Sequence, residues 1–81
     1  MKIRFTFQGH KNYDALPSRL KRAVDKQFNF LLRNIRYPSL KAKKYDEAND
    51  IWQARVNDDY RFYFQIEGDI YWIISIISHP K

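Results

Sequence analysis

The sequence of 81 residues contains no cysteine, and this absence removes several kinds of site at once. Without cysteine the chain has no disulfide scaffold, no cysteine-ligated zinc and no thiol nucleophile. The only histidines are His10 and His79, too few for a typical zinc site. Glycine is also scarce, with two residues, which leaves no Gly-rich loop for a nucleotide phosphate. We therefore expect no metal and no small-molecule cofactor.

Long apolar runs are also missing. No stretch approaches the roughly 20 apolar residues that span a bilayer. The N-terminal segment Met1-Lys2-Ile3-Arg4-Phe5 has no apolar stretch long enough for a signal peptide. These absences predict a cytoplasmic protein without membrane contact. The short length predicts one domain over residues 1–81.

Aromatic residues and positive charge are plentiful. Aromatics make up 17% of the chain, and the formal net charge is +6. Because each aromatic side chain buries a large area, few residues are needed to build a core. The basic excess occurs in local clusters and favours an acidic partner or a nucleic acid, although solubility alone is the alternative explanation.

Periodicity predicts an α+β fold. Apolar residues alternate at the N-terminus, as in a half-buried strand, and recur at three- and four-residue steps after Pro17, as in an amphipathic helix. We expect a first strand, a short helix and a long helix, then a polar connection and a three-stranded antiparallel meander, with the helices packed on one face of the sheet. The expected ranges are 2–7 and 10–16 for the first strand and short helix, 18–34 for the long helix, 39–50 for the connection, and 51–56, 60–67 and 70–78 for the meander.

Two arginines are the most informative polar residues. If Asn57, Asp58 and Asp59 form the turn, Arg55 and Arg61 lie opposite each other and share a face of the sheet. Two guanidinium groups side by side repel unless an anion joins them. A phosphate bound between them is one interpretation, because guanidinium groups match phosphate oxygens. A structural salt bridge to Glu67 or Asp50 is the other.

Other charged residues are open to two interpretations. Lys43 and Lys44 precede the first strand of the meander and either flank the face of the arginines or belong to a solvated loop. His79 follows the last strand; histidine exchanges protons near neutral pH, but a terminal histidine is often inert. The carboxylates of Asp46, Glu47 and Asp50 favour a solvated loop.

Several segments together resemble the RelE/ParE toxin superfamily. They are Ile51-Trp52-Gln53-Ala54-Arg55-Val56, Asp59-Tyr60-Arg61-Phe62-Tyr63-Phe64 and the Gly68-Asp69 hairpin. Pro38-Ser39-Leu40-Lys41 with Lys43-Lys44 is similar to the basic lead-in of the family, and Leu16-Pro17 lies where the family turns between its helices. The resemblance covers about residues 3–79, and its Tyr60-Arg61 block is moderately specific.

The resemblance implies a toxin of a type II toxin–antitoxin system. RelE-, YoeB- and HigB-like members cleave ribosome-bound mRNA through attack of the 2′-hydroxyl on the adjacent phosphate. By this resemblance Arg61 would bind the scissile phosphate, Arg55 would assist, and His79 would shuttle a proton. Lys41, Lys43 and Lys44 would contact the RNA backbone, and an acidic antitoxin would be the cognate partner.

The sequence departs from the family pattern near its end. Pro80 stands where the family has a tyrosine after the histidine, no basic residue occurs from Ile74 to Ser78, and no carboxylate occurs between Lys41 and Tyr45. Two other functions therefore stay open. One is inhibition of DNA gyrase, as in ParE-like members, and the other is a degenerate module that binds an antitoxin without catalysis.

Overall fold

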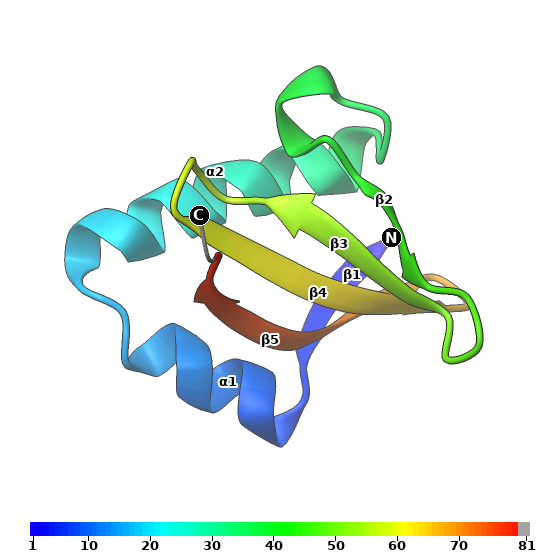
Figure 1. Ribbon diagram of the computed structural model, residues 1–81, viewed down its shortest axis with the longest axis horizontal. Coiled ribbons are helices and arrows are strands. Elements are labelled where there is room, and N and C mark those ends of the chain that lie inside the picture. Colours follow the sequence, from blue (N-terminus) through cyan, green and yellow to red (C-terminus); the bar gives the residue numbers. More distant parts are fainter. Residues whose placement is uncertain (80–81) are drawn as a thin grey trace.

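One five-stranded sheet organises the molecule, which we describe from a computed structural model over residues 1–79. The strands lie in the order β1-β5-β4-β3-β2 (Figure 1). Along the chain the elements are β1 (Lys2–Phe5), α1 (Phe7–Asp14), α2 (Ser18–Arg33), the 3-10 helix η1 (Pro38–Leu40), β2 (Lys43–Asp46), β3 (Ile51–Arg55), β4 (Tyr60–Glu67) and β5 (Ile70–Ser78).

The predicted α+β fold is confirmed, and the sheet is mixed. Strands β3, β4 and β5 form the expected antiparallel meander. Strand β1, the first in the chain, lies parallel to β5, with Ile3 opposite Tyr71 and Phe5 opposite Ile73. A parallel pair requires a long crossover connection. The helices α1 and α2 lie in the segment between β1 and the rest of the sheet and provide that connection.

The N-terminal strand ends earlier than its alternation predicts. Phe7 was expected in the strand, but it begins α1 and its side chain is 86% exposed. The reason is Thr6, whose hydroxyl oxygen accepts a hydrogen bond from the Gly9 backbone N–H at 3.1 Å. This N-cap satisfies a helical N–H that otherwise lacks a partner, so the helix starts three residues before the predicted start at His10.

The polar connection contains an unpredicted strand. Residues Lys43–Asp46 form β2 and pair antiparallel with β3, with Lys43 opposite Gln53 and Lys44 opposite Trp52. The sequence hides this strand because β2 is at the edge of the sheet. Edge strands commonly carry lysine, which discourages pairing with other chains.

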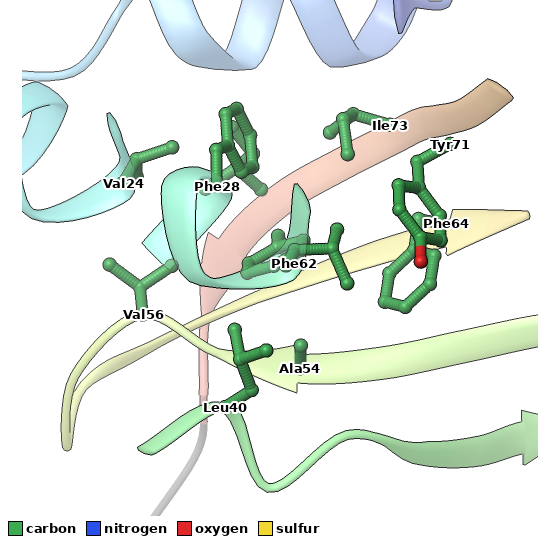
Figure 2. Packing of buried hydrophobic residues seen from close by; sticks show 11 residues of the cluster. Val24, Phe28, Leu40, Ala54, Val56, Phe62, Phe64, Tyr71 and Ile73 are labelled. Atoms are coloured by element: carbon green, nitrogen blue, oxygen red, sulfur yellow. The ribbon is translucent and has the colours of Figure 1, made fainter. Parts of the chain in front are cut away.

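The core lies between α2 and one face of the sheet. Figure 2 shows Val24 and Phe28 of α2 among buried side chains from β4 and β5. The rings of Phe28 and Phe62 meet edge to face with centroids 5.1 Å apart, a favoured aromatic geometry. The apolar stripe that predicted the long helix is therefore the face that packs on the sheet.

Helix α1 covers the part of β5 that extends beyond β1 (Figure 1). The Asn12 side-chain oxygen accepts a hydrogen bond from the Ile76 backbone N–H at 3.1 Å, and the Thr6 backbone N–H donates to the Ile73 carbonyl at 3.1 Å. Gly9 permits this approach, since a Cβ there would lie 2.0 Å from the Ile73 carbonyl oxygen. The helix thus supplies hydrogen bonds that a longer β1 would otherwise make.

Two side chains fix α2 relative to its neighbours. The Tyr13 hydroxyl of α1 donates to Asp25 at 2.8 Å, and burial together with this hydrogen bond raises the pKa of Tyr13 to about 12. Gln27 is buried, and its Nε2 donates to the backbone carbonyls of Arg55 at 2.7 Å and Ser39 at 3.2 Å. Gln27 therefore holds the end of β3 and η1 against the helix.

Within residues 1–79, no helix has the length and apolar character needed to cross a membrane.

Candidate functional site

The sheet face opposite the core carries two rows of side chains that are set by strand register. Ala54, Phe62 and Ile76 are buried in the core, so their neighbours along each strand point to the other face. The first row contains Lys43, Gln53, Tyr63 and Ser75, and the second contains Arg55, Arg61 and Ile77.

Five side chains from separate segments meet in one pocket at the basic end of this face, which we call the Arg61 pocket. It has a volume of about 190 Å³ and is lined by Lys41, Lys43, Gln53, Arg61 and His79. Three strands contribute one residue each, while Lys41 follows η1 and His79 follows β5. The pocket contains three cationic side chains and an imidazole, and no carboxylate of residues 1–79 lines it. It is therefore suited to bind an anion.

Arg61 is held by the turn before its strand. Its Nη1 donates to the backbone carbonyls of Asn57 at 2.5 Å and Tyr60 at 3.0 Å. Within residues 1–79, Nε and Nη2 have no hydrogen-bond partner. One edge of the guanidinium group is thus fixed, and its other N–H groups are available to an anionic ligand.

Arg55 lies opposite Arg61, as the turn predicts, but it does not line the pocket. Its guanidinium group pairs with Asp58 in the turn. The anticipated carboxylates are engaged elsewhere, because Asp50 binds Lys44 and Glu67 accepts a hydrogen bond from Trp72. The turn between the two strands therefore supplies acceptors for both arginines, which relieves their repulsion without a shared phosphate.

The three candidate lysines are separated by the alternation of β2. Lys41 and Lys43 line the Arg61 pocket, whereas Lys44 lies on the other side of the strand. Lys44 Nζ is 2.8 Å from an Asp50 oxygen and lies 5.1 Å from the centre of the Trp52 ring. The hydrogen bond to Asp50 raises the pKa of Lys44. The structure does not bring Lys44 to the pocket.

Lys41 has an unusual backbone conformation. Its φ of 46° and ψ of 41° are left-handed, where it caps η1 by donating its backbone N–H to the Pro38 carbonyl at 3.3 Å. A residue other than glycine in this region is strained by about 1–2 kcal/mol. The fold thus keeps a lysine at a position where glycine would be more stable.

His79 is fixed by its backbone. Its N–H donates to the Asp59 carbonyl at 2.6 Å, which continues the pairing of β5 with the start of β4. This bond brings the imidazole to the pocket that contains Arg61. The neighbouring departure from the family pattern, Pro80, lies outside the described residues. Within residues 1–79, no three histidine, aspartate or glutamate side chains gather in a way that could hold a metal ion.

Sequence reasoning missed Gln53. This side chain is only 8% exposed, lines the Arg61 pocket and donates from Nε2 to the Tyr63 hydroxyl at 2.9 Å. The signal that could have revealed it is the alternation of β3, in which Gln53 and Arg55 share a face. A hydroxyl that accepts a hydrogen bond can still donate its own proton, so Tyr63 can orient a ligand on this face.

An apolar groove lies on the sheet in addition to the Arg61 pocket. It has a volume of about 230 Å³ and is lined by Tyr45, Ile51, Tyr63, Ile74, Ser75 and Ile77. Tyr45 is 61% exposed, and the centroid of its ring lies 5.0 Å from the centroid of the Tyr63 ring. This sheet-face groove, with Tyr45 and Ile77 exposed, is the type of surface that a partner covers.

The whole fold is similar to solved toxin structures. A YoeB/ParE toxin from Agrobacterium tumefaciens has a TM-score of 0.82 at 16% identity, covering 99% of this chain and 100% of that one. The YoeB dimer from Staphylococcus aureus has a TM-score of 0.81 at 16% identity, covering 99% and 98%. The toxin–antitoxin complex RelBE2 from Mycobacterium tuberculosis has a TM-score of 0.72 at 21% identity, covering 96% of each chain.

Neither the protein-family models nor the curated proteins give a match to the chain. The structural likeness extends over almost the whole chain, including every strand that lines the Arg61 pocket. The chain therefore has the fold of the RelE/ParE toxin superfamily, and the predicted resemblance is confirmed at the level of the fold.

Proposed function

We propose that the chain is the toxin of a toxin–antitoxin pair and that it cleaves ribosome-bound mRNA. The observation that carries the proposal is the Arg61 pocket, in which three cationic side chains and an imidazole converge with no carboxylate from the described part of the chain. Such a group of donors suits a phosphodiester, whose charge increases as a fifth oxygen bonds to phosphorus. The likeness to solved toxins with the same fold supports the proposal of a toxin, and the choice of a phosphodiester substrate rests on the pocket.

The cleavage step requires removal of a proton from the 2′-hydroxyl, stabilisation of the charge on the phosphate, and delivery of a proton to the leaving oxygen. The 2′-hydroxyl of one nucleotide loses its proton and attacks the adjacent phosphorus. The bond to the 5′-oxygen of the next nucleotide then breaks, and that oxygen takes up a proton. The products are a 2′,3′-cyclic phosphate and a 5′-hydroxyl end, so no water is consumed in this step.

The pocket residues fit these tasks in different ways. Arg61, already oriented by the turn carbonyls, would direct its remaining N–H groups at the nonbridging phosphate oxygens. Lys41 and Lys43 would hold the flanking backbone. His79, the only imidazole in the pocket, would take the proton from the 2′-hydroxyl and deliver a proton to the leaving 5′-oxygen. Arg55 and Lys44 take no direct part in this proposal, since each already has a carboxylate partner.

An acidic antitoxin is the proposed protein partner. The net charge of +6 favours an acidic chain, and the sheet-face groove offers an apolar surface beside the cationic pocket. A segment lying in that groove would cover Tyr45 and Ile77 and restrict access to Arg61. The likeness to the RelBE2 toxin–antitoxin complex is consistent with such a partner.

The test is inducible expression in a bacterial host, with mapping of mRNA 5′ ends. We expect growth arrest and new 5′ ends within translated regions, both lost in Arg61→Gln and His79→Ala. Arg19→Gln is the matched control, because Arg19 is exposed on α2 and lies outside the pocket.

Three results would count against the proposal. If Arg61→Gln and His79→Ala arrest growth like the parent, the assigned site is wrong. Trapped DNA breaks without mRNA cuts would identify gyrase as the target instead. Antitoxin binding without either activity would identify a non-catalytic module.

A further inference from the structure

A larger pocket than the two described above lies where α2 ends and η1 begins. It has a volume of about 500 Å³, and its walls include Ile35, Arg36, Tyr37, Lys41 and Trp52. This volume is within the range of about 300–1,000 Å³ that small-molecule sites occupy. We call it the Tyr37 pocket. Apart from Lys41, none of its residues has a role in the proposed cleavage step.

The Tyr37 pocket adjoins the Arg61 pocket across the edge of the sheet. Lys41 lines both. Trp52 lines the Tyr37 pocket and Gln53 lines the Arg61 pocket. Consecutive residues of a strand point to opposite faces of the sheet. The two pockets therefore lie on opposite sides of the β2–β3 edge, with Lys41 between them. A polymer bound in one can reach the other by passing around this edge.

The ring of Tyr37 is held ready for stacking. It lies parallel to Phe30, with centroids 3.9 Å apart and an interplanar angle of 7°. The loop that carries it is fixed by Asn34, whose carbonyl accepts from the Tyr37 N–H and whose side-chain oxygen accepts from the Arg36 N–H, each at 2.9 Å. Phe30 covers one face of the ring, and Tyr37 is still 37% exposed. Tyr37 also lines the pocket, so the exposed part of its side chain can contact a ligand bound there.

The charge of the Tyr37 pocket matches a phosphate-bearing ligand. Arg36 and Lys41 line it, and among the residues that the structure describes no acidic one does. Within residues 1–79, neither side chain has an ion-pair partner. An aromatic platform beside unpaired cations is the combination that binds single-stranded nucleic acid, in which bases stack and phosphates are neutralised.

We propose that the Tyr37 pocket holds a nucleotide of the RNA strand that flanks the cleaved phosphodiester, with its base stacked on Tyr37 and its phosphate near Lys41 and Arg36. This inference rests on the proposed function and adds to it a second substrate contact. The strand would pass around the β2–β3 edge at Lys41. An acidic protein segment in the same pocket is the competing occupant, and the test distinguishes the two.

The experiment measures single-turnover cleavage of a translated mRNA by the full chain. Removing a stacking aromatic weakens nucleic-acid binding by about 5- to 150-fold per base. At subsaturating protein we expect Tyr37→Ala to slow cleavage by a factor in this range, while Tyr37→Phe retains the parent rate. Phe7→Ala is the matched control, because Phe7 is an exposed aromatic outside both pockets. Photocrosslinking with 4-thiouridine placed beside the cleaved nucleotide should label the Tyr37 peptide.

Each other outcome decides against the inference in a distinguishable way. If the parent cleaves mRNA and Tyr37→Ala cleaves it equally fast, the proposed function stands and the nucleotide site is wrong. If Tyr37→Ala leaves cleavage unchanged but weakens antitoxin binding, the pocket takes a protein segment. If the parent does not cleave mRNA, the proposed function and the inference fall together.

Discussion

At the scale of single residues, Arg55 and Arg61 differ in what holds their guanidinium groups although they face each other in the sheet. Asp58 pairs with Arg55, whereas the Arg61 side chain, within residues 1–79, donates only to backbone carbonyls and lines the Arg61 pocket. A carboxylate partner cancels the charge that a phosphate would need, and a carbonyl does not. The two residues are therefore a matched pair for testing the site.

Arg61→Gln should reduce mRNA cleavage by about 10²–10³-fold, the usual effect of removing one donor to a transition-state oxyanion. Arg55→Gln should have a much smaller effect, because the charge it removes is already paired. Cleavage rates measured on the same translated mRNA compare the two. Equal losses in both variants would show that the phosphate lies between the arginines.

Lys41 links backbone strain to the pocket. Its left-handed φ of 46° favours glycine, yet the lysine side chain lines both pockets. Lys41→Gly and Lys41→Ala remove the same charge and differ only by a Cβ. We expect Lys41→Gly to be more stable than Lys41→Ala by about 1 kcal/mol, measured by urea unfolding. We also expect both to cleave RNA equally poorly. Equal stabilities would contradict the strain argument.

At the scale of elements, the contact of α1 with β5 is controlled by one glycine. Helices normally lose about 1 kcal/mol with glycine in place of alanine, so propensity alone favours Gly9→Ala. The added Cβ would lie 2.0 Å from the Ile73 carbonyl oxygen, which is backbone and cannot rotate away. Overpacking of this kind costs about 1–3 kcal/mol, and the stiff backbone puts this case at the upper end.

The clash therefore outweighs the gain in helix propensity, and Gly9→Ala should destabilise the fold by about 1–2 kcal/mol. Chemical denaturation of the variant and the parent gives this difference. Gln8→Ala, an exposed neighbour in the same helix, should stay within about 0.5 kcal/mol of the parent. A stabilised Gly9→Ala would show that α1 does not pack on β5 as described.

At the scale of the whole molecule, the net charge and the cations that line the two pockets make separate contributions to RNA binding. The chain carries +6 overall, but only a few of its cations line the two pockets. Long-range attraction depends on the sum of charges, and counterion release depends on those that contact phosphates. The salt dependence of binding separates these effects.

Lys43→Met should lower the slope of log affinity against log salt by about 0.7, the value for one lost contact to a single strand. Lys11→Glu changes the net charge by more, yet it should leave the slope nearly unchanged because Lys11 lines neither pocket. Fluorescence anisotropy with a non-cleavable 2′-O-methyl RNA over a range of salt measures both slopes. A larger change for Lys11→Glu would indicate that binding is non-specific.

The meander and the long helix are predictable from the sequence alone, because their periodicities of two and about 3.6 residues are local properties of strands and helices. The same alternation placed Arg55 opposite Arg61. The Thr6 cap that places Phe7 in a helix is a local contact, whereas tertiary structure paired Lys43–Asp46 as an edge strand and brought His79 to Arg61 through the Asp59 carbonyl. The alternation of β2 separated Lys43 from Lys44, and the turn gave Arg55, but within residues 1–79 not Arg61, a carboxylate partner. These outcomes depend on contacts between segments distant in sequence or on the particular shape of a turn, which a pattern of residue types does not specify.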